Sequence, residues 1–229
     1  MSQATDRPTA QATGNFVVDQ QVSPAGAEGL AAPPPPEAPA VGDPGMIGVP
    51  AFMVGSIALG LVNVGFVPAT AGGAAIPIIL AATSVGQLIA AVWAARLAEN
   101  ASAAIFGIFS GFWLSYAVLV LGLDHNWFAI TTADAVRTQE LFLISWLAIT
   151  VLLTLASLRL PLAFTVLFVL VDIALLLVLL GTAQASTTLV AAGGYAVFAF
   201  VLVGAYLFLN GMSTATGGRA YPLGTPVLH

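Results

Sequence analysis

Long apolar stretches separated by short polar links dominate the chain after a polar beginning. Hydrophobic residues fill six windows, at about 47–67, 75–97, 103–122, 141–158, 161–181 and 189–209. A helix needs about 20 predominantly apolar residues to cross a hydrocarbon layer about 30 Å thick, and each window approaches that length. The pattern therefore predicts an all-α integral membrane protein with six transmembrane helices.

The polar beginning differs in composition from the rest of the chain. Residues 1–42 are rich in proline, alanine and glutamine and include the run PPPPEAPA at 33–40. Such a composition cannot bury enough apolar area to offset the entropy of the chain, which predicts disorder. We therefore divide the chain into a disordered Pro/Ala/Gln-rich cytoplasmic tail, 1–42, a six-helix transmembrane domain, 43–212, and a cytoplasmic C-terminal tail, 213–229.

Composition excludes most other classes of protein. Charged residues make up 7% of the chain and hydrophobic residues 59%, whereas soluble domains carry roughly 25% charged residues. The net charge of −5 arises largely in the tail, because five of the ten acidic residues precede the first helix. All five basic residues are arginines and they form no basic patch, so nucleic acid is not an expected partner.

Nothing in the sequence indicates catalysis. The chain has no cysteine and two histidines, His125 and His229, so neither a thiolate nor a histidine metal centre is expected. No nucleophile and base stand in a catalytic arrangement, and no glycine-rich phosphate loop is present. We predict that the protein is not an enzyme and uses no cofactor and no metal.

The arginines predict the orientation in the membrane. If the N-terminus is cytoplasmic, Arg7, Arg96, Arg159 and Arg219 lie inside and Arg137 lies outside. Cytoplasmic loops usually carry the excess of arginine and lysine, so both termini are predicted to be cytoplasmic. The lack of lysine and the abundance of alanine, glycine and valine are typical of GC-rich bacteria, which points to the plasma (inner) membrane of a bacterium.

Three polar residues lie deep in apolar surroundings: Asn63, Gln87 and Asp172. Asp172 sits near the middle of the fifth window, where an ionised carboxylate costs about 2.5 kcal/mol or more to insert. Such groups usually face the interior of the bundle, so Asp172 is a candidate for proton coupling during transport. A permanently protonated or hydrogen-bonded structural aspartate is the alternative, and the residues alone do not decide between the two.

The start of the first window is a second candidate feature. Pro44 and Pro50 bracket the beginning of a helix, where proline is compatible with the first turn. Free N–H groups and the helix dipole at that position can receive a carboxylate. A plain helix start marked by proline explains the same two residues, so both interpretations stay open.

Other conspicuous residues in the windows are best explained by packing. Phe52, Phe109 and Phe164 lie in separate windows, where a place in the core is the default explanation for an apolar side chain. Gly107 and Gly111 form a GxxxG pair, a pattern typical of close helix contacts.

Separated segments of the chain, spread over about 43–224, resemble the acetate uptake transporter family. That family includes bacterial succinate–acetate permeases and yeast acetate and ammonia export proteins. The matching segments are DPGMIGV at 43–49, NVGF at 63–66, Gln87, IFSGFWL at 108–114 and GRAYPLG at 218–224. The first falls on the family's Asn-Pro-Ala-Pro-Leu-Gly-Leu, with Pro44 and Gly48 identical. The last resembles the closing Gly-Arg-x-x-x-Pro-x-Gly and is one residue shorter.

The resemblance implies a six-helix subunit that assembles as a hexamer, each subunit with its own path for acetate, succinate or related carboxylates. The family's path narrows at a hydrophobic constriction of Phe, Tyr and Leu. Phe52 and Phe109 fall on the first two of these positions, and Phe164 falls on the third after a gap. The residues expected at the substrate entrance and in substrate binding are Pro44, Gly48, Asn63 and Gln87.

This chain also departs from the family pattern. Asp43 replaces the leading asparagine and places a negative charge where an anion would enter. Ala94 stands where the family usually has a glutamate, and Phe109 lacks the hydroxyl of the family's tyrosine. Asp172 has no counterpart. These departures bear on the substrate more than on the fold.

Together, the observations predict a membrane transporter or channel for acetate, succinate or a related small carboxylate, moved together with a proton. A proton neutralises the substrate and so lowers the free energy of desolvation in an apolar constriction. The predicted partners are the small carboxylate, protons, the lipid bilayer and further copies of the chain. An ammonium or ammonia exporter is the first alternative, favoured by Asp43 and Asp172. A non-transporting membrane assembly protein that acts through its N-terminal tail is the second.

Overall fold

A computed structural model describes residues 42–228, so the predicted N-terminal tail lies almost entirely outside the described residues. The elements are α1 (Gly45–Asn63), η1 (Ala69–Ala75), α2 (Ile76–Ile78), η2 (Ile79–Ser84), α3 (Val85–Arg96), α4 (Asn100–Asp124), α5 (Ala135–Ser157), α6 (Leu162–Ala183) and α7 (Thr187–Ala215). η1 is a 3₁₀ helix and η2 a π-helical stretch, and with α2 and α3 they form the second span. No strand occurs between residues 42 and 228, in agreement with the all-α prediction.

Six helices are long and apolar enough to cross a membrane, which confirms the predicted number of spans. Large apolar side chains point outward from all of them; Leu202 on α7 is 73% exposed and Leu141 on α5 is 67% exposed. A soluble protein rarely exposes apolar surface on that scale, whereas hydrocarbon tails accept it without loss of free energy. The chain is therefore a multi-pass membrane protein.

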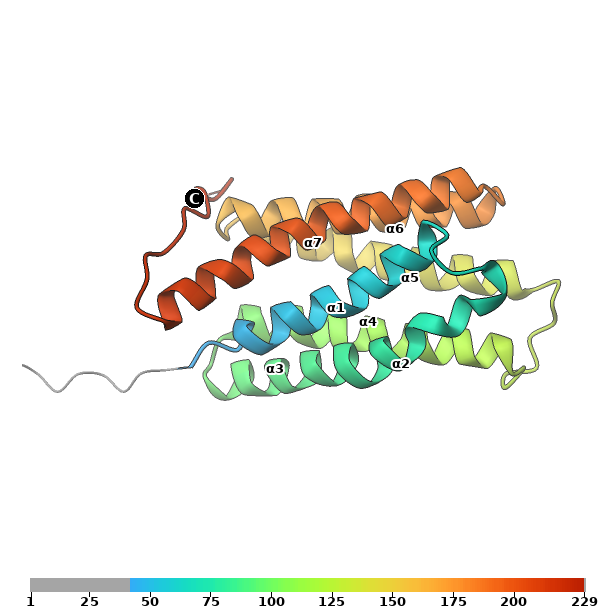
Figure 1. The fold of residues 1–229 in the computed structure, drawn as a ribbon, viewed down its shortest axis with the longest axis horizontal. Helices are drawn as coiled ribbons and strands as arrows, with labels where there is room; N and C mark the ends of the chain where they lie inside the picture. Colours follow the sequence, from blue (N-terminus) through green and yellow to red (C-terminus); the bar gives the residue numbers. More distant parts are fainter. Residues whose placement is uncertain (1–41, 229) are drawn as a thin grey trace, which may run out of the picture. The chain divides into compact units, whose positions relative to one another are not determined.

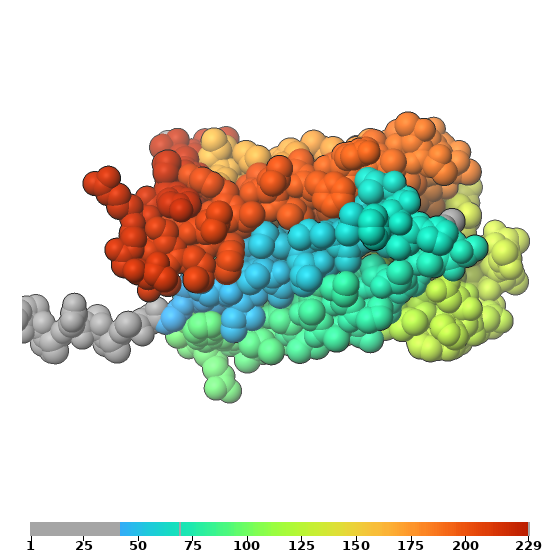
Figure 2. All heavy atoms as spheres, in the orientation of Figure 1, coloured from blue at the N-terminus to red at the C-terminus, as the bar shows by residue number. Residues whose placement is uncertain are grey.

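Consecutive spans run in opposite directions, so their ends collect in two groups (Figure 1). α1 packs against α7 on one side and against η2 and α3 on the other. α6 packs against α7 and α5, and α4 packs against α3. In the space-filling view, the surface of α1 lies between the surfaces of α7 and of the second span (Figure 2). This arrangement brings α1, α4, α6 and α7 around one interior region.

The two groups of helix ends differ in charge. Arg96 at the end of α3, Arg159 between α5 and α6, and Arg219 after α7 belong to one group, which we call the arginine end. Arg137 belongs to the opposite end, where it forms an ion pair of 2.7 Å with Glu140. Arg7 lies outside the described residues. This distribution agrees with the arginine pattern from which the orientation was predicted, and the orientation itself stays a prediction.

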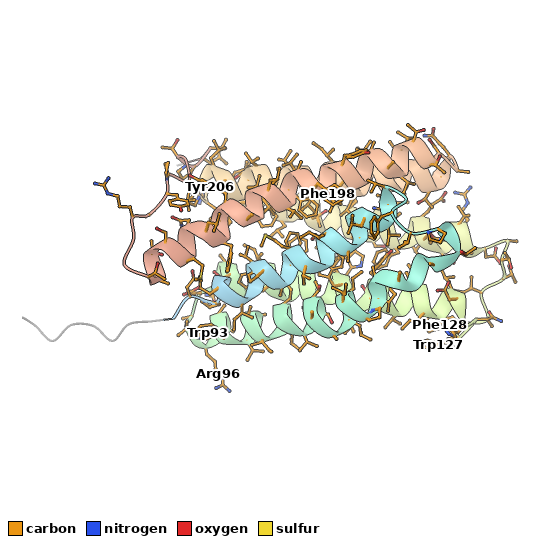
Figure 3. All side chains as sticks on the ribbon, in the orientation of Figure 1. Trp93, Arg96, Trp127, Phe128, Phe198 and Tyr206 are labelled. Carbon is orange, nitrogen blue, oxygen red and sulfur yellow. The ribbon has the colours of Figure 1, made fainter. Side chains whose placement is uncertain are left out.

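Aromatic side chains mark both groups of helix ends. Trp93 lies near Arg96 at the arginine end, and Trp127 with Phe128 lies at the opposite end (Figure 3). Trp127 is 58% exposed. Tryptophan is enriched at both membrane–water interfaces, because its ring is apolar and its N–H is polar. The positions of these side chains fit a bundle whose two ends lie at the two membrane–water interfaces.

The segment after α7 folds back onto the arginine end. The backbone N–H of Leu228 donates to the carbonyl of Leu158 over 2.9 Å. The hydroxyl of Tyr206, labelled in Figure 3, donates to the carbonyl of Pro222 over 2.9 Å. Residues 217–228 are therefore fixed to α7 and to the turn between α5 and α6.

Candidate functional site

Close contact between α1 and the second span positions Gln87. A Cβ added to Gly86 would lie 2.6 Å from the Cβ of Ala51, so a larger residue could not occupy this position at the observed spacing. At that spacing the Nε2 of Gln87 reaches the carbonyl of Gly48 and donates to it over 3.3 Å. The Gln87 side chain is 1% exposed. A polar amide is thereby fixed inside the bundle, beside α1.

A hydrogen bond links η2, the π-helical part of the second span, to α4. Ser110 on α4 donates through its hydroxyl to the carbonyl of Ser84 over 2.9 Å. The hydroxyl of Ser84 itself donates to the carbonyl of Leu80 over 2.6 Å. Single π-helical turns occur frequently at functional sites, and here the turn supplies a carbonyl to a neighbouring helix. The bond fixes α4 to the second span at the residue that follows Phe109.

Four buried phenylalanines meet in the interior region between α1, α4, α6 and α7. The rings of Phe52 and Phe109 meet edge to face with centroids 4.9 Å apart. Phe200 lies 5.4 Å from Phe52, and Phe168 stacks on Phe109 at 6.1 Å. Edge-to-face and offset-stacked pairs at these distances are the favoured arrangements of aromatic rings. We call Phe52, Phe109, Phe168 and Phe200 the aromatic neck.

Four cavities lie in a row between the two ends of the bundle, and the aromatic neck lies between the two inner ones. We name them the arginine-end mouth, about 140 Å³, the Gln87 cavity, about 80 Å³, the Trp113 cavity, about 80 Å³, and the opposite mouth, about 800 Å³. Neighbouring cavities share the lining residues Phe106 and Phe164, then Phe52 and Phe109, and then Asn63. Consecutive cavities thus share lining residues, and the aromatic neck separates the two inner cavities.

The two inner cavities are apolar apart from a few groups. Three of these groups have a buried polar atom without a hydrogen-bond partner among the described residues: Oε1 of Gln87, Nε1 of Trp113 and Nδ2 of Asn63. Gln87 lines the cavity on one side of the aromatic neck, while Trp113 and Asn63 line the cavity on the other side. Buried polar groups are normally paired, so unpaired atoms that face a cavity indicate where a ligand or water would bind.

Asp43 is the one charged side chain among the described residues that line the row of cavities, and it lies in the arginine-end mouth. Its Oδ1 accepts from the N–H of Gly45 over 2.7 Å, and its carbonyl accepts from the N–H of Met46. The carbonyl of Pro44 accepts from the N–H groups of Ile47 and Gly48. The first N–H groups of α1 are therefore already paired, and this helix start has no free donor to offer an anion.

The structure brings some of the predicted constriction residues together. Phe52 and Phe109 are in direct ring contact. Phe164 lines the Gln87 cavity and the arginine-end mouth, and no aromatic pair among the described residues joins it to Phe52 or Phe109. Phe168, one helical turn further along α6, stacks on Phe109 instead. Reasoning from the sequence did not single out Phe168 or Phe200, because nothing distinguishes them from other phenylalanines in apolar helices.

Of the predicted entrance and binding residues, Gln87 and Asn63 line the row of cavities, whereas Pro44 and Gly48 line none of the four. Pro44 is fully buried at the start of α1, and Gly48 lies beneath the ring of Phe106. Gln87 faces the cavity next to them, and Asn63 lies near the other end of α1. The structure thus brings two of the four predicted residues to the cavities, and the part of all four in substrate binding stays a prediction.

Asp172 lies away from the cavities. The hydroxyl of Thr154 on α5 donates to Oδ2 of Asp172 on α6 over 2.6 Å. Its Oδ1 is buried and has no partner among the described residues. Asp172 belongs to none of the four cavity linings, whereas its neighbour Val171 lines the Trp113 cavity. The side chain therefore joins two helices, and its contribution to proton coupling stays a prediction.

Comparison with known proteins places the chain in a family. A model of the GPR1/FUN34/yaaH family matches residues 27–221, which is most of the sequence. The chain belongs to the GPR1/FUN34/yaaH family. This membership confirms the resemblance to acetate transporters drawn from the first helix, Gln87 and the closing segment.

Two curated relatives each match part of this GPR1/FUN34/yaaH family member. Acetate permease A of Emericella nidulans is 26% identical over 174 residues, 69% of this chain and 57% of the relative. The meiotically up-regulated gene 86 protein of Schizosaccharomyces pombe is 31% identical over 146 residues, 59% of this chain and 45% of the relative. The chain thus spans about half the length of the curated relatives that it matches.

A solved structure has the same fold. The bacterial acetate channel SatP superposes with a TM-score of 0.71 at 17% sequence identity. The match covers 81% of this chain and 100% of the SatP chain. At this identity the likeness concerns the fold, which is that of a six-helix membrane protein of the GPR1/FUN34/yaaH family.

Proposed function

We propose that this protein is a transporter or channel, rather than an enzyme, for acetate, succinate or a related small carboxylate. The observation that carries the proposal is the row of cavities interrupted by the aromatic neck, inside a fold shared with an acetate channel. The name of the Emericella nidulans relative, an acetate permease, supports the same substrate class.

The aromatic neck is proposed as the constriction. Phe52 and Phe109 close the space between the two inner cavities, and Phe164 lines the approach from the arginine end. An apolar constriction gates by excluding water, which raises the free energy of a charged group that passes through it. A proton that travels with the substrate removes that charge, so we propose that a proton moves with each carboxylate.

Asp172 is proposed as a proton-sensitive group that acts at a distance from the substrate. Because it contacts Thr154 and none of the cavities, a change in its charge would act on the packing of α5 against α6. Asp172→Asn keeps an oxygen that accepts from Thr154 and removes the charge. We expect the variant to alter the pH dependence of uptake. An unaltered pH profile would remove Asp172 from the mechanism.

The assembly and location that we propose are those expected from the sequence and its family resemblance. We propose a homo-hexamer, in which each subunit has its own path, in the plasma (inner) membrane of a bacterium with both termini cytoplasmic. Exposed apolar faces such as that of Leu202 on α7 and Leu141 on α5 are available for lipid or for neighbouring subunits. The mass of the protein in mild detergent, measured by light scattering with correction for detergent, tests the number of subunits.

Uptake of labelled acetate into proteoliposomes tests the main proposal. The purified protein is reconstituted, uptake is measured with and without an inward proton gradient, and empty liposomes give the leak through lipid. Phe52→Trp enlarges a ring in the aromatic neck and should abolish the protein-dependent uptake. Phe198→Trp is the matched control, because Phe198 lies on α7 against Gly60 and lines none of the four cavities. Uptake no faster than in empty liposomes would refute carboxylate transport.

Ammonium or ammonia export is a second candidate. The carboxylate of Asp43 at the arginine-end mouth and the unpaired Oε1 of Gln87 are both acceptors that suit a cation or an N–H donor. Competition separates the two candidates: acetate flux that succinate inhibits favours the carboxylate, while flux of labelled methylammonium that ammonium inhibits favours the exporter.

A non-transporting assembly protein is the remaining candidate, and it would act through residues outside the described part of the chain. Deletion of residues 1–40 tests it. An assembly function would be lost in the deletion variant, whereas transport through the six-helix domain would persist.

A further inference from the structure

The orientation of the Gln87 amide is determined by its one hydrogen bond. Nε2 donates to the carbonyl of Gly48 over 3.3 Å, so the nitrogen must face that carbonyl and the oxygen must face away from it. The remaining oxygen, Oε1, is buried and accepts nothing from the described residues. A side chain that is 1% exposed and lines the Gln87 cavity therefore carries an unpaired acceptor.

The surroundings of this acceptor hold no positive charge. The described residues that line the Gln87 cavity are apolar except for Gln87 and Ser102. The nearest charged side chain along the row of cavities is Asp43, in the neighbouring arginine-end mouth, and its charge is negative. The start of α1 offers no free N–H, as its first donors are paired. An anion in the Gln87 cavity would thus be desolvated without a compensating charge.

A neutral carboxylic acid fits the same cavity far better than its anion. A carboxylate has no hydrogen to donate, and its negative oxygens would face the lone pairs of Oε1. The neutral acid donates its O–H to Oε1, and the second hydrogen of Nε2 is available to its carbonyl oxygen. The cavity, of about 80 Å³, has the necessary room, since a single water requires roughly 10–15 Å³.

We propose that Gln87 recognises the substrate as the neutral carboxylic acid, so that the proton crosses the aromatic neck on the substrate and not on a protein side chain. On the far side of the neck, Trp113 lines the next cavity, and its indole N–H is unpaired among the described residues. It is a donor suited to the carbonyl oxygen of the same acid. This inference rests on the proposed function, because it concerns the form in which a transported carboxylate passes.

Two measurements on the unaltered protein test the inference. Labelled acetate uptake above that of empty liposomes is first established in proteoliposomes, and the current carried by acetate is then recorded across planar bilayers containing the same preparation. Passage of the neutral acid moves no net charge, so the flux should be electrically silent. Trifluoroacetate, a strong acid of similar size that stays ionised over the pH range used, should be excluded. A proton carried on a protein carboxyl such as Asp172 would still allow trifluoroacetate to pass.

A pair of variants tests the assignment to Gln87. Gln87→Leu removes the acceptor and should reduce acetate flux at least about tenfold, because one hydrogen bond to the substrate is lost in an apolar site. Gln184→Leu is the matched control, since Gln184 is exposed at the end of α6 and lines none of the four cavities. Acetamide, a neutral molecule with an N–H donor and a carbonyl acceptor, should compete with acetate in the unaltered protein.

The outcomes separate this inference from the proposed function. Absence of protein-dependent acetate uptake would overturn the proposed function itself. Acetate uptake with a current that reverses at the acetate equilibrium potential would leave the function standing and overturn the inference. Passage of trifluoroacetate, or equal flux through Gln87→Leu and Gln184→Leu, would also overturn it. Silent uptake with exclusion of trifluoroacetate and a slow Gln87→Leu variant would support it.

Discussion

Truncation of Phe52 is the most direct perturbation of the aromatic neck. The side chain is 6% exposed and stands between the Gln87 cavity and the Trp113 cavity. In Phe52→Ala the ring that separates these cavities is lost, so the two spaces of about 80 Å³ each merge into one passage. We expect the variant to lose its discrimination by size, and larger monocarboxylates such as butyrate should pass nearly as fast as acetate.

The cost in stability follows from the ring contacts of Phe52. Its ring meets those of Phe109 at 4.9 Å, Phe200 at 5.4 Å and Trp113 at 6.2 Å. Aromatic pairs contribute about 0.5–1.5 kcal/mol each beyond buried area, so three pairs give about 1.5–4.5 kcal/mol. Phe→Ala substitutions in soluble cores cost about 3–5 kcal/mol, which lies in the same range. The melting temperature of the purified protein should therefore fall measurably, and folding must be checked before flux is compared.

The assay is the ratio of butyrate uptake to acetate uptake in proteoliposomes, corrected for the leak of empty liposomes. Phe198→Ala is the control, because it truncates a phenylalanine of α7 that packs on Gly60 and lines none of the four cavities. If a folded Phe52→Ala protein kept the ratio of the unaltered protein, the aromatic neck would not be the selective constriction. An equal change in Phe198→Ala would attribute the effect to general loosening.

Two further predictions concern the packing that positions the site. In Gly55→Ala the new Cβ would lie 2.8 Å from the Cγ2 of Thr83, a fully buried side chain, so we expect the free energy of unfolding to fall by about 1–3 kcal/mol. Gly72→Ala is the control, because no atom lies within 4 Å of its added Cβ, and its melting temperature should equal that of the unaltered protein. Equal melting temperatures of the two variants would contradict the close contact at Gly55. Tyr206→Phe removes the hydrogen bond to the carbonyl of Pro222, which contributes about 0.5–1.5 kcal/mol. A protease should therefore cleave residues 217–228 faster in the variant than in the unaltered protein. An unchanged cleavage rate would mean that this bond does not hold the segment.

The number and order of the spans follow from the sequence because lipid imposes a simple requirement. Each span must present about 20 apolar residues, and the hydrophobic windows located all six. The ends of the helices differ more from the ends of the hydrophobic windows. The fourth window starts at about 141, whereas α5 begins at Ala135, because Arg137 and Glu140 pair across one turn and extend the helix beyond the apolar residues.

The contacts between spans were only partly foreseen. The GxxxG pair predicts a close approach, yet a Cβ on Gly107 would make only an ordinary contact of 3.9 Å with the Cβ of Ala91. Tighter contacts lie at other glycines, for example at Gly86, where the corresponding distance to the Cβ of Ala51 is 2.6 Å. The small-residue pattern has a high background in membrane helices, so the pattern alone does not indicate which glycine meets a neighbour.

What the sequence by itself determined is that the chain crosses a membrane six times, that it belongs with acetate transporters, and that Asn63, Gln87 and Asp172 are its unusual polar residues. Only the tertiary structure decided that Gln87 faces a cavity while Asp172 joins Thr154, and that Phe168 and Phe200 complete the neck around Phe52 and Phe109. The physical reason is that both the lipid-facing and the inward-facing sides of these helices are apolar. Hydrophobicity therefore distinguishes the segments that lie in the membrane from those that lie in water. Whether a residue faces lipid or the interior of the bundle depends on which helices pack together.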